Sequence, residues 1–179
     1  MKEVWMTLRE NRPLTDTVWR MELTGDTGAI TAPGQFVNIQ LEGFFLRRPI
    51  SVCDWEEGKL TLIYKIVGGG TERMAGLAQG TKLNLLTGLG NGFDLSRAGA
   101  CPLLLGGGVG VPPLYGLARR LREAGRPVTA VLGFNTGREV FFEREFRALG
   151  CDTVVTTMDG SRGTRGFVTD AMPANSSFF

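Results

Sequence analysis

Residues 103–113 read Leu-Leu-Leu-Gly-Gly-Gly-Val-Gly-Val-Pro-Pro. An apolar run that leads into a glycine-rich loop and two prolines is typical of a buried strand followed by a helix. Such a loop lets the backbone approach a pyrophosphate, whose charge is favoured at a helix N-terminus. The candidate binding residues are Gly106, Gly107, Gly108, Val109 and Gly110. The stretch does not spell Gly-x-Gly-x-x-Gly, so alone it indicates a dinucleotide loop and a purely structural turn about equally.

The residues after this loop alternate between helix and strand patterns. In 113–124, apolar residues recur at i, i+3, i+4 and i+7, with proline in the first turn and glycine after the end, which predicts a helix. Strands are expected at 102–105, 128–134 and 153–157, and a second helix at 139–149. This alternation predicts an α/β domain with a parallel sheet, of the kind that binds nucleotides.

The residues before the loop show a different pattern. Six short runs with period-two alternation predict strands at 4–8, 18–23, 35–41, 49–53, 59–67 and 82–87. Turn residues separate them, which favours a small antiparallel barrel or sandwich. Since the pattern changes near 96–100, we expect two domains, residues 1–98 and residues 99–179.

Composition excludes several classes of function. The 179 residues carry a net charge of +2 and include no histidine and three cysteines. A charge this small, without a long basic run, gives no footprint for nucleic acid. Histidine-based catalysis and histidine-ligated metal are excluded, and three cysteines far apart predict neither a disulfide framework nor a metal site. We expect reduced, mostly buried thiols, and chemistry that comes from a bound cofactor.

The N-terminus lacks the apolar segment of a secretory signal, and glycines and prolines interrupt the most apolar stretch. We therefore expect a cytoplasmic protein with no membrane segment.

Three segments of the first domain together predict a flavin site. A guanidinium grips a diphosphate, a hydroxyl and strand amides bond the polar edge of a flavin ring, and a glycine turn that opens a helix offers free N–H groups to phosphate. For the arginine alone, a solvated surface position is the better interpretation, and the combination changes that judgement. The residues are Arg48, Pro49, Ile50, Ser51, Ile63, Tyr64, Lys65, Gly70 and Thr71.

Two further loops carry open alternatives. Residues 86–94 could line a cleft or close the barrel, and residues 159–166 could contact a nicotinamide dinucleotide or form a solvated turn. The end of the second predicted strand of the α/β domain, at 133–136, lacks the acid that selects a free ribose 2′-hydroxyl, and Arg138 nearby could accept a 2′-phosphate. NAD and NADP both remain open.

Five motifs, in this order along the chain, resemble motifs of the ferredoxin-reductase superfamily. Their residues are most similar to those of the electron-transfer subunits of NAD-dependent dihydroorotate dehydrogenases. The similarity extends to about Asp170. The motifs are Pro33-Gly34-Gln35-Phe36, Arg47-Arg48-Pro49-Ile50-Ser51, Gly68-Gly69-Gly70-Thr71, Leu89-Gly90-Asn91-Gly92-Phe93 and the loop from Gly106.

The resemblance implies an FAD-binding β-barrel followed by an NAD-binding α/β domain. It implies that electrons from dihydroorotate, oxidised on a separate catalytic subunit in a heterotetramer, cross a [2Fe-2S] cluster to FAD and leave as hydride to NAD+. A [2Fe-2S] cluster needs about four thiolates, and its ligands are absent from this chain, so we expect a nucleotide domain that is incomplete at its C-terminus. Two alternatives stay open, a stand-alone NAD(P)H:flavin or ferredoxin oxidoreductase and a non-catalytic truncated remnant.

Overall fold

The computed structural model describes residues 1–172. The chain divides into two compact units, Met1–Phe93 and Asp94–Phe179. The sequence predicts the change of architecture a few residues later, near 96–100. Each unit has its own sheet.

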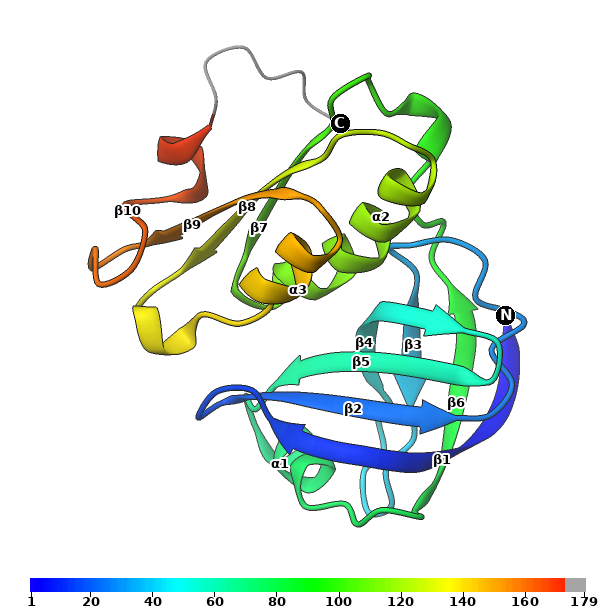
Figure 1. The fold of residues 1–179 in the computed structure, drawn as a ribbon. Helices are drawn as coiled ribbons and strands as arrows, with labels where there is room; N and C mark the ends of the chain where they lie inside the picture. Colours follow the sequence, from blue (N-terminus) through cyan, green and yellow to red (C-terminus); the bar gives the residue numbers. More distant parts are fainter. Residues whose placement is uncertain (173–179) are drawn as a thin grey trace. The chain divides into compact units, whose positions relative to one another are not determined.

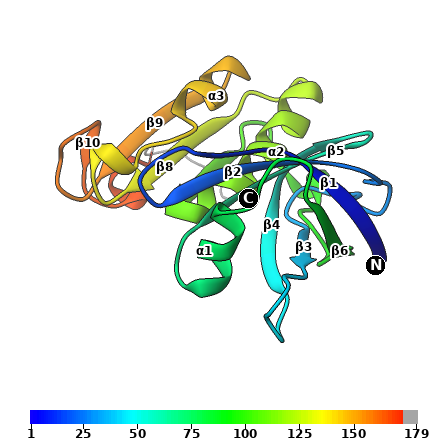
Figure 2. The same ribbon diagram turned by 90° about the horizontal axis from the view of Figure 1, so that it is seen from below.

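The first unit is a closed antiparallel barrel with strand order β1-β2-β5-β4-β3-β6 (Figure 1). Figure 2 shows β1, β2 and β5 on one side of the barrel and β3, β4 and β6 on the other. All six predicted strands are present, and the barrel, not the sandwich, is the arrangement they form. Their bounds are β1 (Lys2–Pro13), β2 (Val18–Thr24), β3 (Phe36–Ile39), β4 (Arg48–Glu56), β5 (Lys59–Lys65) and β6 (Lys82–Leu89).

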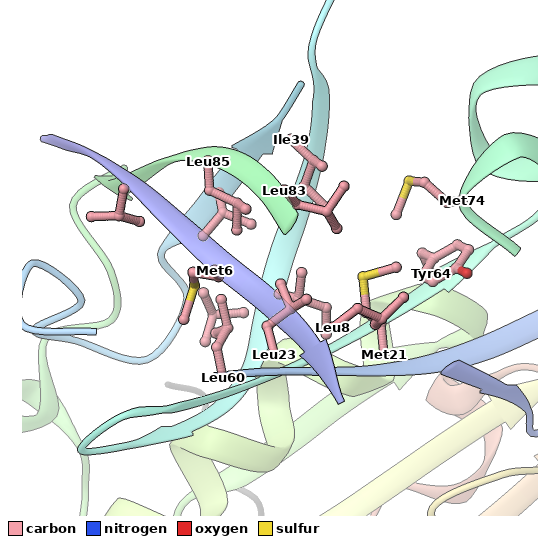
Figure 3. Packing of buried hydrophobic residues seen from close by; sticks show 14 of the residues in the cluster. Met6, Leu8, Met21, Leu23, Ile39, Leu60, Tyr64, Met74, Leu83 and Leu85 are labelled. Carbon is pink, nitrogen blue, oxygen red and sulfur yellow. The ribbon is translucent and has the colours of Figure 1, made fainter. Parts of the chain in front are cut away.

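Alternate side chains of the strands fill the barrel. On β2, Met21 and Leu23 are fully buried, while the intervening Glu22 pairs with Arg20 at 3.1 Å. Figure 3 shows Met21 and Leu23 packed beside apolar side chains of the neighbouring strands. Burial of each large apolar side chain stabilises the fold by about 1.5–3 kcal/mol. The period-two pattern of the sequence is therefore the pattern that closes the barrel.

A short helix, α1 (Gly69–Ala75), connects β5 to β6 and contributes Met74 to the barrel core (Figure 3). The amide of Asn11 on β1 donates hydrogen bonds to the carbonyls of Met74, at 2.8 Å, and Ala75, at 3.3 Å. The hydroxyl of Tyr64 in turn donates to Oδ1 of Asn11 at 3.0 Å. This network fixes the last turn of α1 against the barrel.

The segment after β6 packs on the turn at residues 32–36. Gly90 and Gly92 have φ values of 79° and 73°, a region that favours glycine. A Cβ at Gly92 would lie 2.6 Å from the Cβ of Ala32. Gln35 donates through Nε2 to the carbonyl of Gly90 at 3.0 Å. Within the first unit, this loop therefore packs against the turn at residues 32–36.

The second unit contains a parallel sheet with strand order β10-β9-β8-β7. Two helices, α2 and α3, lie on one of its faces (Figure 1). The predicted alternation of strands and helices is confirmed, whereas the two-residue strand β10 is too short to show in a sequence pattern. The bounds are β7 (Leu103–Gly107), α2 (Val111–Glu123), β8 (Thr129–Phe134), α3 (Glu143–Ala148), β9 (Asp152–Thr157) and β10 (Thr164–Arg165).

The prediction of a helix over 139–149 is wrong at its start. A 3-10 turn, Gly137–Glu139, comes first, and α3 begins at Glu143. Phe142 has a φ of 66°, which a helix cannot continue through. The rings of Phe141 and Phe142 are buried, with the Phe142 ring 5.1 Å from that of Tyr115 on α2. Aromatic burial therefore outweighs helical continuity at this point.

Candidate functional site

The ladder between β4 and β5 ends at the pair Val52 and Leu62. Beyond it, residues 48–51 of β4 pair with β3, and residues 63–65 of β5 pair with β2. The backbone edges that would continue the β4–β5 ladder are therefore available for hydrogen bonds to something other than each other. These two segments are the strand residues that the sequence singles out for flavin binding, and the structure brings them to one opening of the barrel wall.

The side chains at this opening differ in what they offer. Pro49 and Ser51 are exposed on the same face of β4, and Ile50 packs against the barrel core. Ile63 is buried, with 3% of its surface exposed, and Lys65 is half-buried. Ser51 thus presents its hydroxyl beside the free strand edges.

Tyr64 lies inside the barrel. Only 2% of its surface is exposed, and its hydroxyl is hydrogen-bonded to Asn11. Burial raises the pKa of Tyr64 to about 12, against the opposing effect of the Asn11 hydrogen bond. Tyr64 can therefore bind a ligand through its backbone groups, whereas its side chain packs in the barrel core.

Arg48 and Gly70 meet at the start of α1. A Cβ at Gly70 would lie 2.0 Å from Nε of Arg48, so the guanidinium occupies the space that any other residue would fill. Nη1 of Arg48 donates to the carbonyl of Leu46 at 2.6 Å, and its Cζ lies 4.8 Å from the centroid of the Phe44 ring. The sequence predicts Arg48 and Gly70 as parts of one site, and the structure places them in contact.

Thr71 organises the loop before α1. Its Oγ1 accepts hydrogen bonds from the N–H groups of Val67, at 2.9 Å, and Gly68, at 3.3 Å, and donates to the carbonyl of Gly68 at 2.9 Å. The first N–H groups of a helix have no partner within the helix. Thr71 therefore fixes the turn before α1, and the N–H of Gly70, in the first turn, has no partner within the helix.

In the second unit, the predicted dinucleotide loop lies at the carboxyl end of β7. Gly106 is buried, and a Cβ there would lie 2.7 Å from Cδ1 of Leu114, so this glycine allows α2 to pack closely. Gly107 and Gly110 are exposed, and Gly108 has a φ of 50°. Val109 is 46% exposed. Gly107 is thus the last residue of β7, the other three exposed or part-exposed candidates form the turn after it, and Gly106 supports that turn.

The first turn of α2 offers few donors to an anion. Pro112 and Pro113 have no N–H group, and the N–H of Val111 is bonded to the carbonyl of Gly108. The donors of this site are therefore the amides of the glycine loop, and the helix contributes mainly its dipole.

The loops after β8 and β9 are joined at the same edge of the sheet. The N–H of Gly137 donates to Oγ of Ser161 at 2.7 Å, and that hydroxyl donates to Oδ1 of Asp159 at 2.6 Å. The hydroxyl and then the backbone N–H of Ser161 lower the pKa of Asp159. Arg138 and Arg165 are exposed. Ser161 therefore has a structural role, and these two arginines remain candidates for phosphate contact.

One acid at this edge is not among the site residues that the sequence predicts. Oε2 of Glu139 accepts hydrogen bonds from the side-chain amide of Asn135, at 3.0 Å, and from its backbone N–H, at 3.3 Å. The 3-10 turn brings this carboxylate back to the end of β8, where nucleotide-binding sheets hold the acid that bonds the ribose 2′-hydroxyl. A search confined to the residues directly after the strand cannot find it.

Cys53 and Cys151 are buried, and Cys101 is exposed. Residues 1–172 contain no group of three or more histidine, cysteine, aspartate or glutamate side chains placed to hold a metal ion. Within the same residues, no helix is long and apolar enough to cross a membrane.

An antiparallel barrel followed by a parallel sheet with a glycine loop defines a protein of the ferredoxin-reductase-like class. A solved NADH-dependent reduced ferredoxin-NADP oxidoreductase has a TM-score of 0.82 and 32% identity, over 93% of this chain and 61% of that one. The ferredoxin reductase of carbazole 1,9a-dioxygenase has a TM-score of 0.83, with 24% identity over 94% of this chain and 55% of that one, and supports the fold.

Sequence relatives narrow the class. The electron-transfer subunit of dihydroorotate dehydrogenase B (NAD(+)) from Bacillus velezensis is 42% identical in an alignment that covers 96% of this chain and 70% of the relative. Its counterpart from Fusobacterium nucleatum is 41% identical, over 93% of this chain and 67% of the relative. No family model matches the chain. The chain belongs to the family of the electron-transfer subunits of dihydroorotate dehydrogenase B (NAD(+)).

Proposed function

We propose that this protein binds FAD on the barrel unit and NAD on the second unit, and passes electrons from a dihydroorotate-oxidising catalytic subunit to NAD+. The observation that carries the proposal is the convergence of Arg48, Ser51, Gly70 and the free strand edges at residues 63–65. This proposal places the protein in the cytoplasm, in pyrimidine biosynthesis.

The residues at the barrel opening fit FAD. Strand N–H and carbonyl groups can bond the polar edge of the flavin ring, and the Ser51 hydroxyl adds a donor beside them. The Arg48 guanidinium and the amides at Gly70 suit the charge of the diphosphate. Bound FAD would supply the two-electron chemistry, while the protein orients the ring and holds its phosphates.

The glycine loop of the second unit fits a dinucleotide. Its amides at 107–110 can approach the pyrophosphate of NAD without steric hindrance from side chains other than Val109. Glu139 at the end of β8 favours a ribose with a free 2′-hydroxyl, because a carboxylate repels a 2′-phosphate. This supports NAD over NADP.

The name of the family supports a proposal for the partner. Relatives are named as subunits, and we propose a catalytic subunit that oxidises dihydroorotate, joined with this chain in a heterotetramer. In the relatives' family a [2Fe-2S] cluster is expected between the two flavins. The three cysteines of this chain lie far apart, so we assign no cluster ligand to it.

The direct test of the proposal is anaerobic reduction of the FAD-loaded chain. Addition of NADH should bleach the flavin absorption, and NADPH should do so more slowly. A parallel steady-state assay adds the catalytic subunit of a relative and dihydroorotate. NAD+ reduction by dihydroorotate only with that subunit supports the proposal. Absence of that activity, together with NAD(P)H oxidation by the chain alone when free flavin or ferredoxin is the electron acceptor, indicates a stand-alone reductase.

The Arg48→Ala variant tests the FAD site itself. Loss of a charge-assisted contact of about 1.5–3 kcal/mol should weaken FAD binding by roughly 10- to 100-fold. Arg47→Ala is the matched control, because Arg47 is bonded to Asn84 of β6, at 2.7 Å from Nη2 to Oδ1, and pairs with Glu3. Flavin fluorescence titration measures both affinities, and an unchanged affinity in Arg48→Ala would remove Arg48 from the site.

A further inference from the structure

The ring of Phe44 forms a surface beneath the Arg48 guanidinium. Phe44 lies just before β4, and Cζ of Arg48 is 4.8 Å from its ring centroid, within the range of a cation–π interaction. A Cβ built at Gly69 would lie 3.8 Å from the edge of the same ring. The ring therefore fills the space between the segment before β4 and the first turn of α1.

Three contacts restrict the guanidinium. It lies over the Phe44 ring, donates Nη1 to the carbonyl of Leu46, and has Nε against the backbone of Gly70. An arginine side chain that is fixed before it binds loses less conformational entropy on binding. The contacts therefore prepare the guanidinium for a ligand.

The charge of Arg48 has no carboxylate partner among residues 1–172. Arg47, its neighbour in sequence, pairs with Glu3 at 3.3 Å. A fixed guanidinium that the protein leaves unneutralised is suited to an anionic ligand.

We propose that Phe44 is a positioning residue that holds Arg48 for the diphosphate of the dinucleotide flavin, and so sets the preference of the barrel for FAD over FMN. This inference rests on the proposed FAD site and adds a residue to which no role has been assigned. FMN carries one phosphate where FAD carries two, so it lacks the second phosphate, to which we assign Arg48. On that assignment Phe44 should matter for FAD and not for FMN.

The test compares the unaltered chain, Phe44→Leu, Arg48→Ala and the double variant with a control variant. Phe44→Leu keeps an apolar side chain and removes the aromatic face. Phe45→Leu is the matched control, since Phe45 is the adjacent aromatic residue and its side chain is fully exposed. Dissociation constants for FAD and FMN come from flavin fluorescence titration, and thermal unfolding of each apoprotein checks that the variants fold.

We expect Phe44→Leu to weaken FAD binding about three- to tenfold, in line with a cation–π interaction at a half-buried site. FMN affinity should stay within about twofold of the unaltered chain, and Phe45→Leu should change neither. In the double variant the FAD affinity should equal that of Arg48→Ala alone, because Phe44 acts through Arg48.

Two results would overturn the inference. Equal losses of FAD and FMN affinity in Phe44→Leu would assign Phe44 to the general structure of the barrel, and an additive double variant would show that Phe44 acts independently of Arg48. An unaltered chain that binds no flavin would overturn the FAD site and this inference together. The FAD titration of the unaltered chain shows this result before any variant is compared.

Discussion

Replacement of Tyr64 by phenylalanine separates a role in the core from a role in the flavin site. The substitution removes one hydroxyl, whose hydrogen bond to Asn11 measures 3.0 Å, from a residue that is 2% exposed. Loss of the donor leaves the Asn11 acceptor unsatisfied at a cost of about 1–2 kcal/mol. For a barrel of this size, that corresponds to a Tm lower by roughly 5–10 °C.

The same variant changes the dependence of stability on pH. The unfolded pKa of tyrosine is about 10, and burial raises the pKa of Tyr64 to about 12 in the folded chain. The folded state therefore keeps its proton longer, so this contribution to stability is complete below pH 10 and is lost as the pH rises toward 12. Tyr64→Phe should lack that loss.

The assay is thermal unfolding of the apoprotein, followed by circular dichroism from neutral pH to about pH 11, together with an FAD titration at neutral pH. The structure predicts a lower Tm and an FAD affinity within about twofold of the unaltered chain. A tenfold loss of FAD affinity at an unchanged Tm would show instead that the hydroxyl contacts the flavin and not Asn11.

Three further outcomes are expected. Arg47→Ala should lower the free energy of unfolding by about 1–2 kcal/mol, because it removes hydrogen bonds that join β3 and β6. Urea titration measures the change, and an unchanged unfolding midpoint would show that these hydrogen bonds do not stabilise the barrel. Gly106→Val should destabilise the second unit by about 1–3 kcal/mol, since its Cβ would lie 2.7 Å from Leu114, and NAD binding should weaken with it; a fully stable variant would show that α2 can move away. Cys101 should react with a thiol reagent well before the two buried thiols, which peptide mass spectrometry after brief labelling can show; equal labelling would mean that the buried thiols open to solvent.

The barrel could be predicted from the sequence because its strands carry their own periodicity. Met21 and Leu23 alternate with charged residues, and this alternation is typical of a strand with one buried and one exposed face. Helix α2 could be predicted for the same reason, with prolines at its start. The start of α3 could not, because the conformation of Phe142 is decided by ring contacts with residues distant in the sequence, and no local pattern records them.

The candidate sites divide in a similar way. Arg48, Ser51 and the glycine loop could be selected from residue chemistry and resemblance. Phe44 could not, since a ring placed under a guanidinium leaves no periodic signal in the sequence. Glu139 has no signal in the sequence, because a 3-10 turn returns its carboxylate to a strand end four residues earlier. The strand pattern predicts Tyr64 as a site residue, and its burial shows that its side chain points into the core.

The most direct test of the central claim is the near-ultraviolet and visible absorption spectrum of the purified chain, with the released flavin identified after denaturation. The proposed FAD site predicts the two absorption bands of an oxidised flavin, and FAD as the molecule released, because the barrel binds the ring and the diphosphate together. A colourless protein that takes up no added FAD would rule out a flavin site on the barrel.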